Sequence, residues 1–275
     1  MQADSVTPRV IEIQKTQTVD SIGACQGVAI HDDRIFLYGD REIGVIREYR
    51  KSGDSLKMIG KELRLTVNGS DLINHPTGLA YRKGMPTFIG NSTKLNKEGT
   101  LWKTEIFAIN WEGLQKTGTL DGNVVKHIDD NGCIQGARPE YVKYRGKWFV
   151  ASADYGGKNN EVRLYDPSLL VKADSSSQQG VVVKRFKCSP WVQNLHFVKQ
   201  TGVLVLIQNQ VDGRKWRLTF VDMEKSFAEG KEHVLKVIDT DRADELEGFV
   251  FEGKTHTGIA VSSARKNNVN FLPIP

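Results

Sequence analysis

Five polar residues open five segments that share one pattern. Each segment begins with a polar residue and continues as an apolar, alternating strand, a tight polar turn and a second strand, which is the pattern of a β-hairpin. The opening residues are Gln26, Thr77, Glu140, Gln193 and Glu247. If the five segments are equivalent in the fold, these side chains converge. Two of them are carboxylates, which repel each other unless a proton, a basic side chain or a cation neutralises them.

The five residues together offer carboxylate, amide and hydroxyl oxygens. A set of this kind suits a hard cation such as Ca²⁺, so we predict a calcium site built from Gln26, Thr77, Glu140, Gln193 and Glu247. Zinc would require His or Cys ligands. His75 and His196 lie nearby in the sequence, but strand alternation directs His196 into the sheet packing. The alternative is a hydrated polar channel in which Arg138 neutralises a glutamate.

The spacing of the five residues indicates the fold that must position them. They lie 51, 63, 53 and 54 positions apart, and each interval holds a hairpin followed by two more strand patterns. A four-stranded unit repeated at about this spacing is typical of a β-propeller. We therefore predict an all-β, five-bladed β-propeller with four-stranded blades, forming a single domain over residues 1–275. The alternative is a β-sandwich or two small β domains, because short strands at regular spacing also occur there.

The last blade lacks a strand in its own segment. After the hairpin that starts at Glu247, only "NNVNFLPI" remains. We expect the N-terminal "RVIEIQK" (9–15) to pair into this blade, because joining the two ends of the chain removes an open sheet edge. Helix should be slight, and the stretches 167–179 and 223–230 look like surface excursions between blade strands.

In such a ring the innermost strands begin around one mouth of a central channel. The second strands of the hairpins end at the same face, which brings Asp40 and Asp154 to this mouth. We predict that one of these carboxylates takes a proton from a metal-bound water. The residues expected to form a substrate rim are Arg41, Arg138, Tyr155, Lys158, Trp191 and Arg214.

Three blade motifs resemble the soluble calcium-activated nucleotidases, the apyrases. "LEGFVF" is similar to that family's "YEGIEF"-type final motif, "RPEYVKYRGKWFV" to its "HESACW"-type strand, and blade four to its "SSFKF"-type strand. The resemblance implies a five-bladed propeller with calcium on its axis, held by Glu140 and Glu247. It departs at Thr77, where the family has a glutamate, and at Gln26 and Gln193, where it has serines.

These observations predict a calcium-centred hydrolase that acts on a phosphate or carboxylate ester of a small molecule at the axial mouth. The ion would polarise the P=O or C=O group and activate water. The alternative is a non-catalytic propeller that binds a glycan, peptide or protein, with Tyr155 and Trp191 in the contact surface and any ion purely structural.

The composition and charge of the chain restrict the classes of partner that we expect it to bind. The net charge is +5, with charges of both signs interspersed along the chain, which argues against nucleic acid and fits a small anionic substrate or a glycan. No apolar run is long enough to span a membrane, and we expect a monomer. There is no GxSxG, P-loop, HExxH or dinucleotide-binding motif. Cys25, Cys133 and Cys188 form no CxxC pair. The start "MQADSV" suggests a start codon ahead of an exported chain, hence a secreted or periplasmic location.

Overall fold

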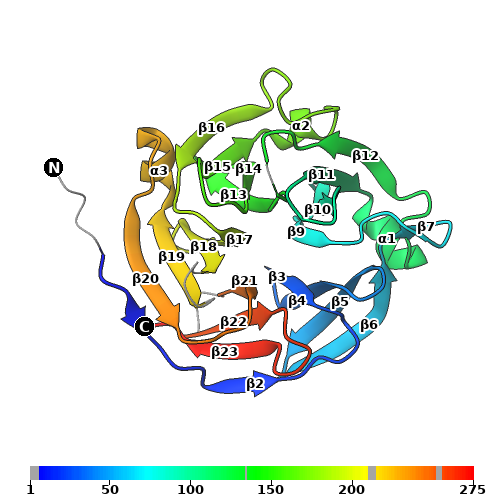
Figure 1. Cartoon of the computed structure of the whole chain (residues 1–275). Helices are drawn as coiled ribbons and strands as arrows, with labels where there is room; N and C mark the ends of the chain where they lie inside the picture. Colours follow the sequence, from blue (N-terminus) through cyan, green and yellow to red (C-terminus); the bar gives the residue numbers. More distant parts are fainter. Residues whose placement is uncertain (1–5, 134, 210–214, 252–255) are drawn as a thin grey trace.

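The computed structural model describes residues 6–133, 135–209, 215–251 and 256–275. Five β-sheets are arranged in a ring around a central axis, each running from an inner strand at the axis to an outer strand at the rim (Figure 1). The prediction of a five-bladed β-propeller is confirmed. None of the helices in the described ranges is long and apolar enough to cross a membrane.

The blades follow one another in chain order. Blades one to three each consist of four consecutive antiparallel strands. Blade one is β3 (Cys25–His31), β4 (Arg34–Asp40), β5 (Gly44–Lys51) and β6 (Leu56–Arg64). Blade two is β9 (Pro76–Ala80), β10 (Thr87–Lys94), β11 (Trp102–Ile109) and β12 (Val124–Asp129). Blade three is β13 (Glu140–Tyr144), β14 (Lys147–Ala153), β15 (Glu161–Tyr165) and β16 (Val182–Lys187). The short pair β7 (Thr66–Val67) and β8 (Ser70–Asp71) lies between blades one and two.

Blades four and five receive strands from the N-terminal segment. Blade four is β17 (Val192–Val198), β18 (Val203–Asn209), β19 (Trp216–Asp222) and β20 (Val234–Thr240), and β1 (Arg9–Val10) is added in parallel to its outer edge. Blade five is β21 (Leu246–Val250), β22 (Thr257–Ser262) and β23 (Val269–Pro273), completed by β2 (Lys15–Gln17).

The expected closure is therefore right in kind but wrong in extent. Residues 15–17 complete blade five, whereas Arg9–Val10 pair with blade four. Between the two strands, Ile11 is buried in the apolar cluster that joins blades four and five. Burying Ile11 there moves the chain from the edge of one blade to the edge of the next (Figure 1).

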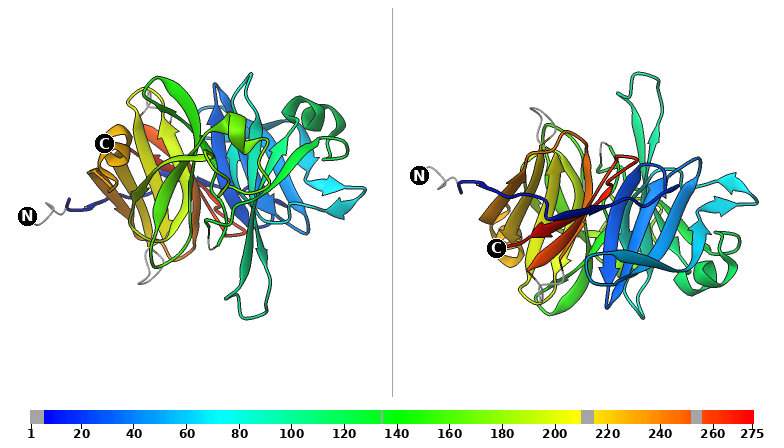
Figure 2. Two further views of the ribbon diagram at one scale, coloured as in Figure 1. Left: turned by 90° about the horizontal axis from the view of Figure 1, so that it is seen from above. Right: turned by 90° about the horizontal axis from the view of Figure 1, so that it is seen from below.

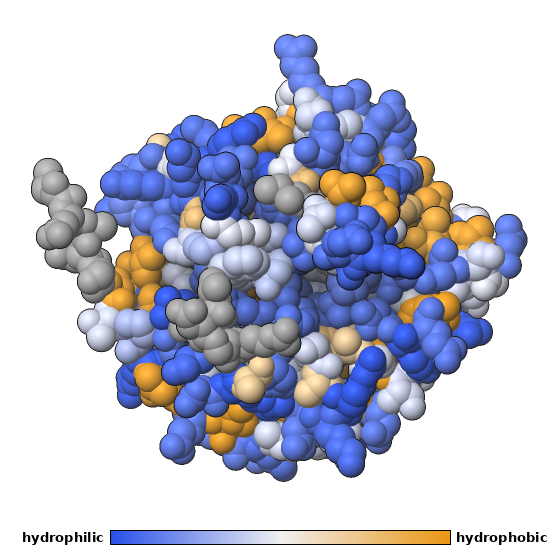
Figure 3. Space-filling view, in the orientation of Figure 1, coloured by the Kyte–Doolittle hydropathy of each residue, from blue (hydrophilic) through white to orange (hydrophobic). Residues whose placement is uncertain are grey.

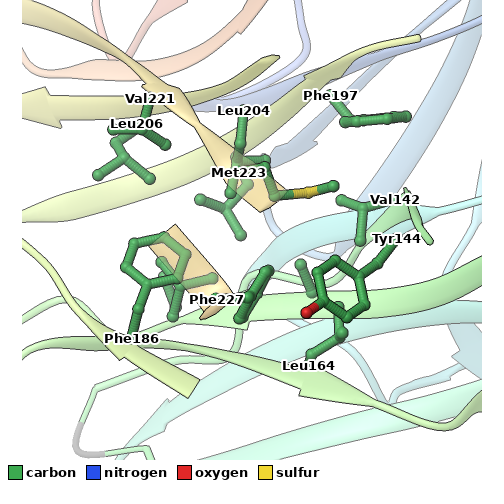
Figure 4. Packing of buried hydrophobic residues seen from close by; sticks show 14 of the residues in the cluster. Val142, Tyr144, Leu164, Phe186, Phe197, Leu204, Leu206, Val221, Met223 and Phe227 are labelled. Atoms are coloured by element: carbon green, nitrogen blue, oxygen red, sulfur yellow. The ribbon is translucent and has the colours of Figure 1, made fainter. Parts of the chain in front are cut away.

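The core lies between neighbouring blades. In the cluster between blades three and four, Val142, Leu164 and Phe186 pack against Leu204 and Phe227 (Figure 4). Alternation along each strand supplies one apolar face to each neighbouring blade, so every blade except for its edges is covered on both sides. The helices are short and lie in connections at the periphery: α1 (Trp111–Thr117), α2 (Pro167–Leu170) and α3 (Met223–Glu229).

The side views show a disc from which one hairpin, β10–β11, extends (Figure 2). At the disc centre the channel is crossed by Tyr38 of β4, which is 1% exposed. Its Oη accepts a 2.7 Å hydrogen bond from Nδ2 of Asn194 in blade four. Blades one and four are not neighbours, so this bond crosses the axis. Gly27 makes room for it, because a Cβ there would lie 2.3 Å from the Tyr38 ring. The bond separates two mouths, which we call the upper mouth, where the innermost strands begin, and the lower mouth, where their hairpin turns lie.

Candidate functional site

Four of the predicted site residues lie at β-bulges at the upper mouth. In blade one the strand ladder pairs Cys25 with Gly39 and Gly27 with Tyr38, which leaves Gln26 as the extra residue of a bulge. The ladders of blades two, four and five shift in the same way around Thr77, Gln193 and Glu247. A bulge re-aims the side chain of its extra residue. Because the same bulge recurs in four blades, it is a regular feature of this propeller and not a local defect.

In blade three the equivalent residue is Arg138, and the prediction of Glu140 for this position is corrected. Glu140 already pairs regularly with Ala151. Two residues earlier, the backbone N–H of Arg138 donates to Oγ of Ser152, which places Arg138 beside the strand end as the bulge residues are in the other blades. The polar ring of the upper mouth is thus Gln26, Thr77, Arg138, Gln193 and Glu247, all at most 9% exposed.

A signal for this register is present in the sequence. The residue after each ring position is small or cyclic: Gly27, Gly78, Pro139, Asn194 and Gly248. These residues approach one another near the axis, and a Cβ on Gly78 would lie 2.6 Å from Pro139. Aligning "RP" with "QG", "TG" and "EG" would have identified Arg138. The apolar alternation of "EYVKY" instead favoured Glu140.

Glu247 is the acidic member of the ring. Burial raises the pKa of its carboxyl well above the usual value, the negative charges of Glu245 and Asp40 raise it further, and Arg138 opposes them. The backbone carbonyl of Glu247 accepts a 3.1 Å bond from Nδ2 of Asn194. The structure therefore places a carboxyl that favours its protonated form at the centre of the mouth.

Arg138 is the basic member of the ring and is only 4% exposed. Its Nη2 donates a 3.2 Å hydrogen bond to Oε1 of Gln193. Its Nε and Nη1 are buried and have no hydrogen-bond partner in the structure. Burial lowers the pKa of this guanidinium, while the charges of Asp154 and Glu247 raise it.

Two further residues at the upper mouth have unsatisfied polar atoms that the sequence patterns did not single out. Nδ2 of Asn209, at the end of β18, and Oγ of Ser262, at the end of β22, are buried without a partner. Native proteins satisfy nearly all such atoms, so each exception needs an explanation, of which a missing bound molecule is one. Together with Arg138, these atoms form a set of hydrogen-bonding groups that an occupant of the mouth would satisfy.

Asp40 lies beside the ring, as predicted, and accepts three hydrogen bonds. Its Oδ1 accepts from the backbone N–H of Ala24 at 3.0 Å, and its Oδ2 accepts from Nε2 of Gln26 at 3.1 Å. Nδ1 of His75 lies 3.0 Å from the same Oδ2. His75, left without a role by the sequence, thus contacts a candidate catalytic group.

Asp154 has a different environment from Asp40. Its Oδ1 accepts a 2.9 Å bond from the backbone N–H of Gln135, so it fixes the loop that leads to Arg138. Next to it, the rings of Tyr155 and Trp191 meet edge to face with centroids 5.1 Å apart. Trp191 has a φ of 64°, a left-handed conformation that costs energy in a non-glycine residue and is concentrated at functional sites. The two rings form an aromatic wall beside the ring of polar residues.

The other predicted rim residues contribute less to the mouth. Arg41 donates to Glu62 and to the carbonyl of Ser21, both at 3.0 Å, and so supports blade one. Lys158 is exposed in the connection between β14 and β15. Arg214 lies outside the described residues. The surface seen along the ring axis is largely hydrophilic (Figure 3).

The residues of the mouth do not match the calcium site that the sequence predicted. That site required two ring carboxylates, and the second position carries the guanidinium of Arg138, which repels a cation. Among the described residues no group of three or more His, Cys, Asp or Glu side chains is arranged to hold a metal ion. We therefore derive no chemical step through calcium. Cys25, Cys133 and Cys188 are free thiols.

Comparisons with known proteins bear on the fold. No protein-family model matches the chain, and no curated protein matches it, so the resemblance to apyrases stays a prediction. Among solved structures, a GH43 β-1,3-galactosidase with galactodeoxynojirimycin superposes with a TM-score of 0.54 at 11% identity, covering 94% of this chain and 93% of that one.

Two further solved structures share less. Hydrazine synthase of Kuenenia stuttgartiensis gives a TM-score of 0.46 at 14% identity, covering 91% of this chain, and a chain of the mitotic checkpoint complex gives 0.45 at 9%, covering 90%. The present chain spans only 58% and 62% of those two chains. At these identities the likeness concerns the fold alone: the chain is a five-bladed β-propeller.

Proposed function

We propose that the upper mouth binds a carbohydrate and hydrolyses its glycosidic bond, with Glu247 as general acid and Asp40 as the partner carboxylate. The observation that carries this proposal is the contrast between the two groups. Burial raises the pKa of the Glu247 carboxyl well above its usual value, whereas the Asp40 carboxylate contacts Ala24, Gln26 and His75. Two carboxyl groups in contrasting environments at one mouth are the arrangement that glycoside hydrolysis uses.

The surroundings of the pair support a polyhydroxyl substrate. Nε and Nη1 of Arg138 would donate hydrogen bonds to the hydroxyl groups of a sugar, and Oγ of Ser262 would donate or accept one. The aromatic wall of Tyr155 and Trp191 supplies a flat apolar surface against which the C–H face of a sugar ring packs. The fold of the GH43 β-1,3-galactosidase is consistent with this choice and makes β-galactosides the first substrates to test.

In the proposed reaction, the carboxyl of Glu247 donates its proton to the glycosidic oxygen as the bond to the anomeric carbon breaks. The carboxylate of Asp40 either attacks the anomeric carbon or deprotonates the water that does so. Gln26 and His75 orient Asp40 through their contacts with its Oδ2. Asp154 acts as a positioning residue through Gln135.

The unpaired guanidinium atoms of Arg138 favour a second candidate, the anionic ester substrate predicted from the sequence. A phosphate or carboxylate would form charge-assisted bonds with Nε and Nη1. This candidate differs from the first in the bond that is cleaved, so one set of assays separates them.

The test uses 4-methylumbelliferyl glycosides, phosphate and acetate, each with calcium and with a chelator. We expect glycoside hydrolysis in both conditions, with kcat/KM reduced by roughly 10²- to 10⁴-fold in Glu247→Gln and Asp40→Asn. Glu161→Gln, the same change on a half-buried carboxylate of β15 paired with Arg185, is the control and should retain full activity. If only the phosphate or the acetate is hydrolysed, the glycosidase proposal is wrong and the protein is an ester hydrolase. No turnover of any substrate, with glycan binding at this mouth, would leave a non-catalytic binding propeller.

A further inference from the structure

The lower mouth contains a pocket that is separate from the site described above. It has a volume of about 680 Å³, within the range that holds a small organic ligand. The residues that line it come from all five blades: Ile30, His31, Asp32, Asp33, Tyr81, Arg82, Lys83, Glu140, Tyr141, Trp148, His196, Phe197, Lys199, Gln200 and Phe251. The Tyr38–Asn194 bond lies between this pocket and the upper mouth.

We propose that this lower pocket binds a small molecule with an anionic group and an aromatic or otherwise apolar body. The proposal is independent of the hydrolase function. It rests on three features of the pocket: the charges at its rim, the uncharged polar groups at its floor, and its aromatic walls.

The rim of the pocket has an excess of available positive charge. Lys83 and Lys199 are exposed, and no ion pair joins either of them to another described residue. Asp32 and Asp33 also line the rim, with side chains that are 81% and 68% exposed. Asp33 pairs with Arg50 at 3.3 Å, and Asp32 lies 3.4 Å from Nε2 of His31. With Arg82, the rim thus presents three basic side chains against these two carboxylates.

The floor carries polar groups whose charged forms are disfavoured by burial. Burial raises the pKa of Glu140 to about 8, and a hydrogen bond from the backbone N–H of Phe197 partly offsets this rise. Burial also lowers the pKa of His196 to about 4; its Nε2 lies 3.0 Å from both the N and the O of Phe251. A protonated Glu140 does not repel an anion and donates a hydrogen bond to it.

The walls fit a flat apolar body. The guanidinium of Arg82 lies 3.6 Å above the Trp148 ring, and Trp148 meets Phe197 edge to face at 6.2 Å. On the other side Tyr81 packs against His31 with centroids 4.7 Å apart. A planar ligand placed between these rings would bury apolar surface while its anionic group reaches Lys199 or Lys83.

A cationic ligand is the opposite alternative, because aromatic walls around a carboxyl group also suit an ammonium ion. The pH response distinguishes the two. Deprotonation of Glu140 adds a negative charge to the floor, so affinity for an anion falls as the pH rises past about 8, whereas affinity for a cation increases. The other charged or titratable groups around the pocket are His31, Asp32, Asp33, Tyr81, Arg82, Lys83, Tyr141, His196 and Lys199.

The experiment uses the fluorescent anion 8-anilinonaphthalene-1-sulfonate and its uncharged analogue N-phenyl-1-naphthylamine, with energy transfer from tryptophan and calorimetry as readouts. The test variant is Lys83→Gln with Lys199→Gln. The matched control is Lys57→Gln with Lys97→Gln, two exposed lysines away from the pocket. We expect the test variant to weaken binding of the sulfonate about tenfold, and the control to change it less than twofold. Trp148→Phe should reduce the energy transfer, because Trp148 lines the pocket and is the tryptophan nearest to the probe.

Two further results complete the test. Between pH 7 and pH 9 the affinity of the unmodified protein for the sulfonate should fall, and Glu140→Gln should flatten this dependence. Equal effects of the test and control variants, tight binding of the uncharged analogue, or an affinity that increases with pH would each overturn the proposal. Glycosidase assays on the same variants keep its outcome separate from that of the upper mouth.

Discussion

Tyr38 of blade one and Asn194 of blade four share a 2.7 Å hydrogen bond across the axis of the ring. Asn194 also donates to the backbone carbonyl of Glu247, so one amide group links the bond across the channel to the candidate acid. The bond gives the centre of the propeller a fixed spacing, because it joins two blades that have no shared edge.

Removing the Tyr38 hydroxyl should destabilise the protein. In Tyr38→Phe the Asn194 amide loses one acceptor in a fully buried site, and we expect a loss of about 1–3 kcal/mol in the free energy of unfolding. Tyr144→Phe is the control, since Oη of Tyr144 is buried without a partner and its removal should be neutral or stabilising. Urea unfolding measures both. Equal losses in the two variants would show that the bond across the axis contributes nothing.

Glu247→Gln should change how stability depends on pH. Because the pKa of Glu247 is raised in the folded protein, its contribution to the free energy of unfolding is fully present below the unfolded-state pKa near 4.5. This contribution is lost as the pH increases from that value to the folded-state pKa, by about 1.4 kcal/mol for each pH unit. We expect the variant to match the unmodified protein at pH 4 and to exceed its stability at pH 8.

A Glu247→Gln variant that is less stable than the unmodified protein at pH 8 would indicate an ion pair between Glu247 and Arg138. If a charged Glu247 pairs with Arg138, the substitution leaves the buried guanidinium without its counter-ion and destabilises by about 3 kcal/mol or more. A variant less stable than the unmodified protein at pH 8 would contradict a protonated Glu247. It would also count against Glu247 as the general acid.

Calcium should have little effect on thermal stability. An ion at 100 times its dissociation constant that binds only the folded state would stabilise by about 2.7 kcal/mol. The ring of the upper mouth contains one carboxyl and one guanidinium, so we expect the melting midpoints in calcium and in chelator to coincide. A midpoint that increases with calcium concentration would restore the metal site predicted from the sequence.

Asn268 fastens the N-terminal segment to blade five. Its Oδ1 accepts from the backbone N–H of Val19 at 2.8 Å and its Nδ2 donates to the carbonyl of Val19 at 2.9 Å, and the residue is fully buried. We expect Asn268→Ala to lower the free energy of unfolding by about 2–3 kcal/mol. Thr16→Ala, which removes an exposed hydrogen bond to Asn267, should cost less than about 0.5 kcal/mol.

Limited proteolysis adds a second measurement for Asn268→Ala. If this residue holds the closure, cleavage of the N-terminal segment should accelerate in Asn268→Ala under native conditions, and not in Thr16→Ala. Unchanged cleavage in both variants would show that the strand pairing of β2 suffices without the side chain.

The fold was predictable because each blade repeats its hairpin, and the hairpin pattern depends on local alternation and turn residues. Four of the five ring positions followed from the same repeat. The fifth did not, since Glu140 and Arg138 both precede an apolar strand, and the apolar alternation favoured Glu140 over the Arg138–Pro139 pair that matches the other blades. The residues that support each position, such as Ser152 beneath Arg138, come from the neighbouring strand.

The centre and the lower mouth lay beyond the sequence patterns for a different reason. Tyr38 alternates with core residues in its strand, so nothing local distinguishes a ring that crosses the axis from one buried between blades. The lower pocket joins turns that are more than 150 positions apart, such as those at Asp32 and Lys199. Residues that meet only after ring closure leave no spacing to detect. The path of Arg9–Val10 along blade four belongs to the same class.

The attachment of Lys15–Gln17 to Val269–Phe271 also determines when the ring can form. During synthesis β2 leaves the ribosome about 250 residues before its partner β23. Blades one to four can therefore fold as an open arc before Val269–Phe271 are synthesised. Until then residues 15–17 remain without their partner strand. Assembly of the axial mouth, which needs Glu247 from the last blade, becomes the final step of folding. An incomplete nascent chain then has no assembled upper mouth, and the candidate activity would arise only in the closed ring.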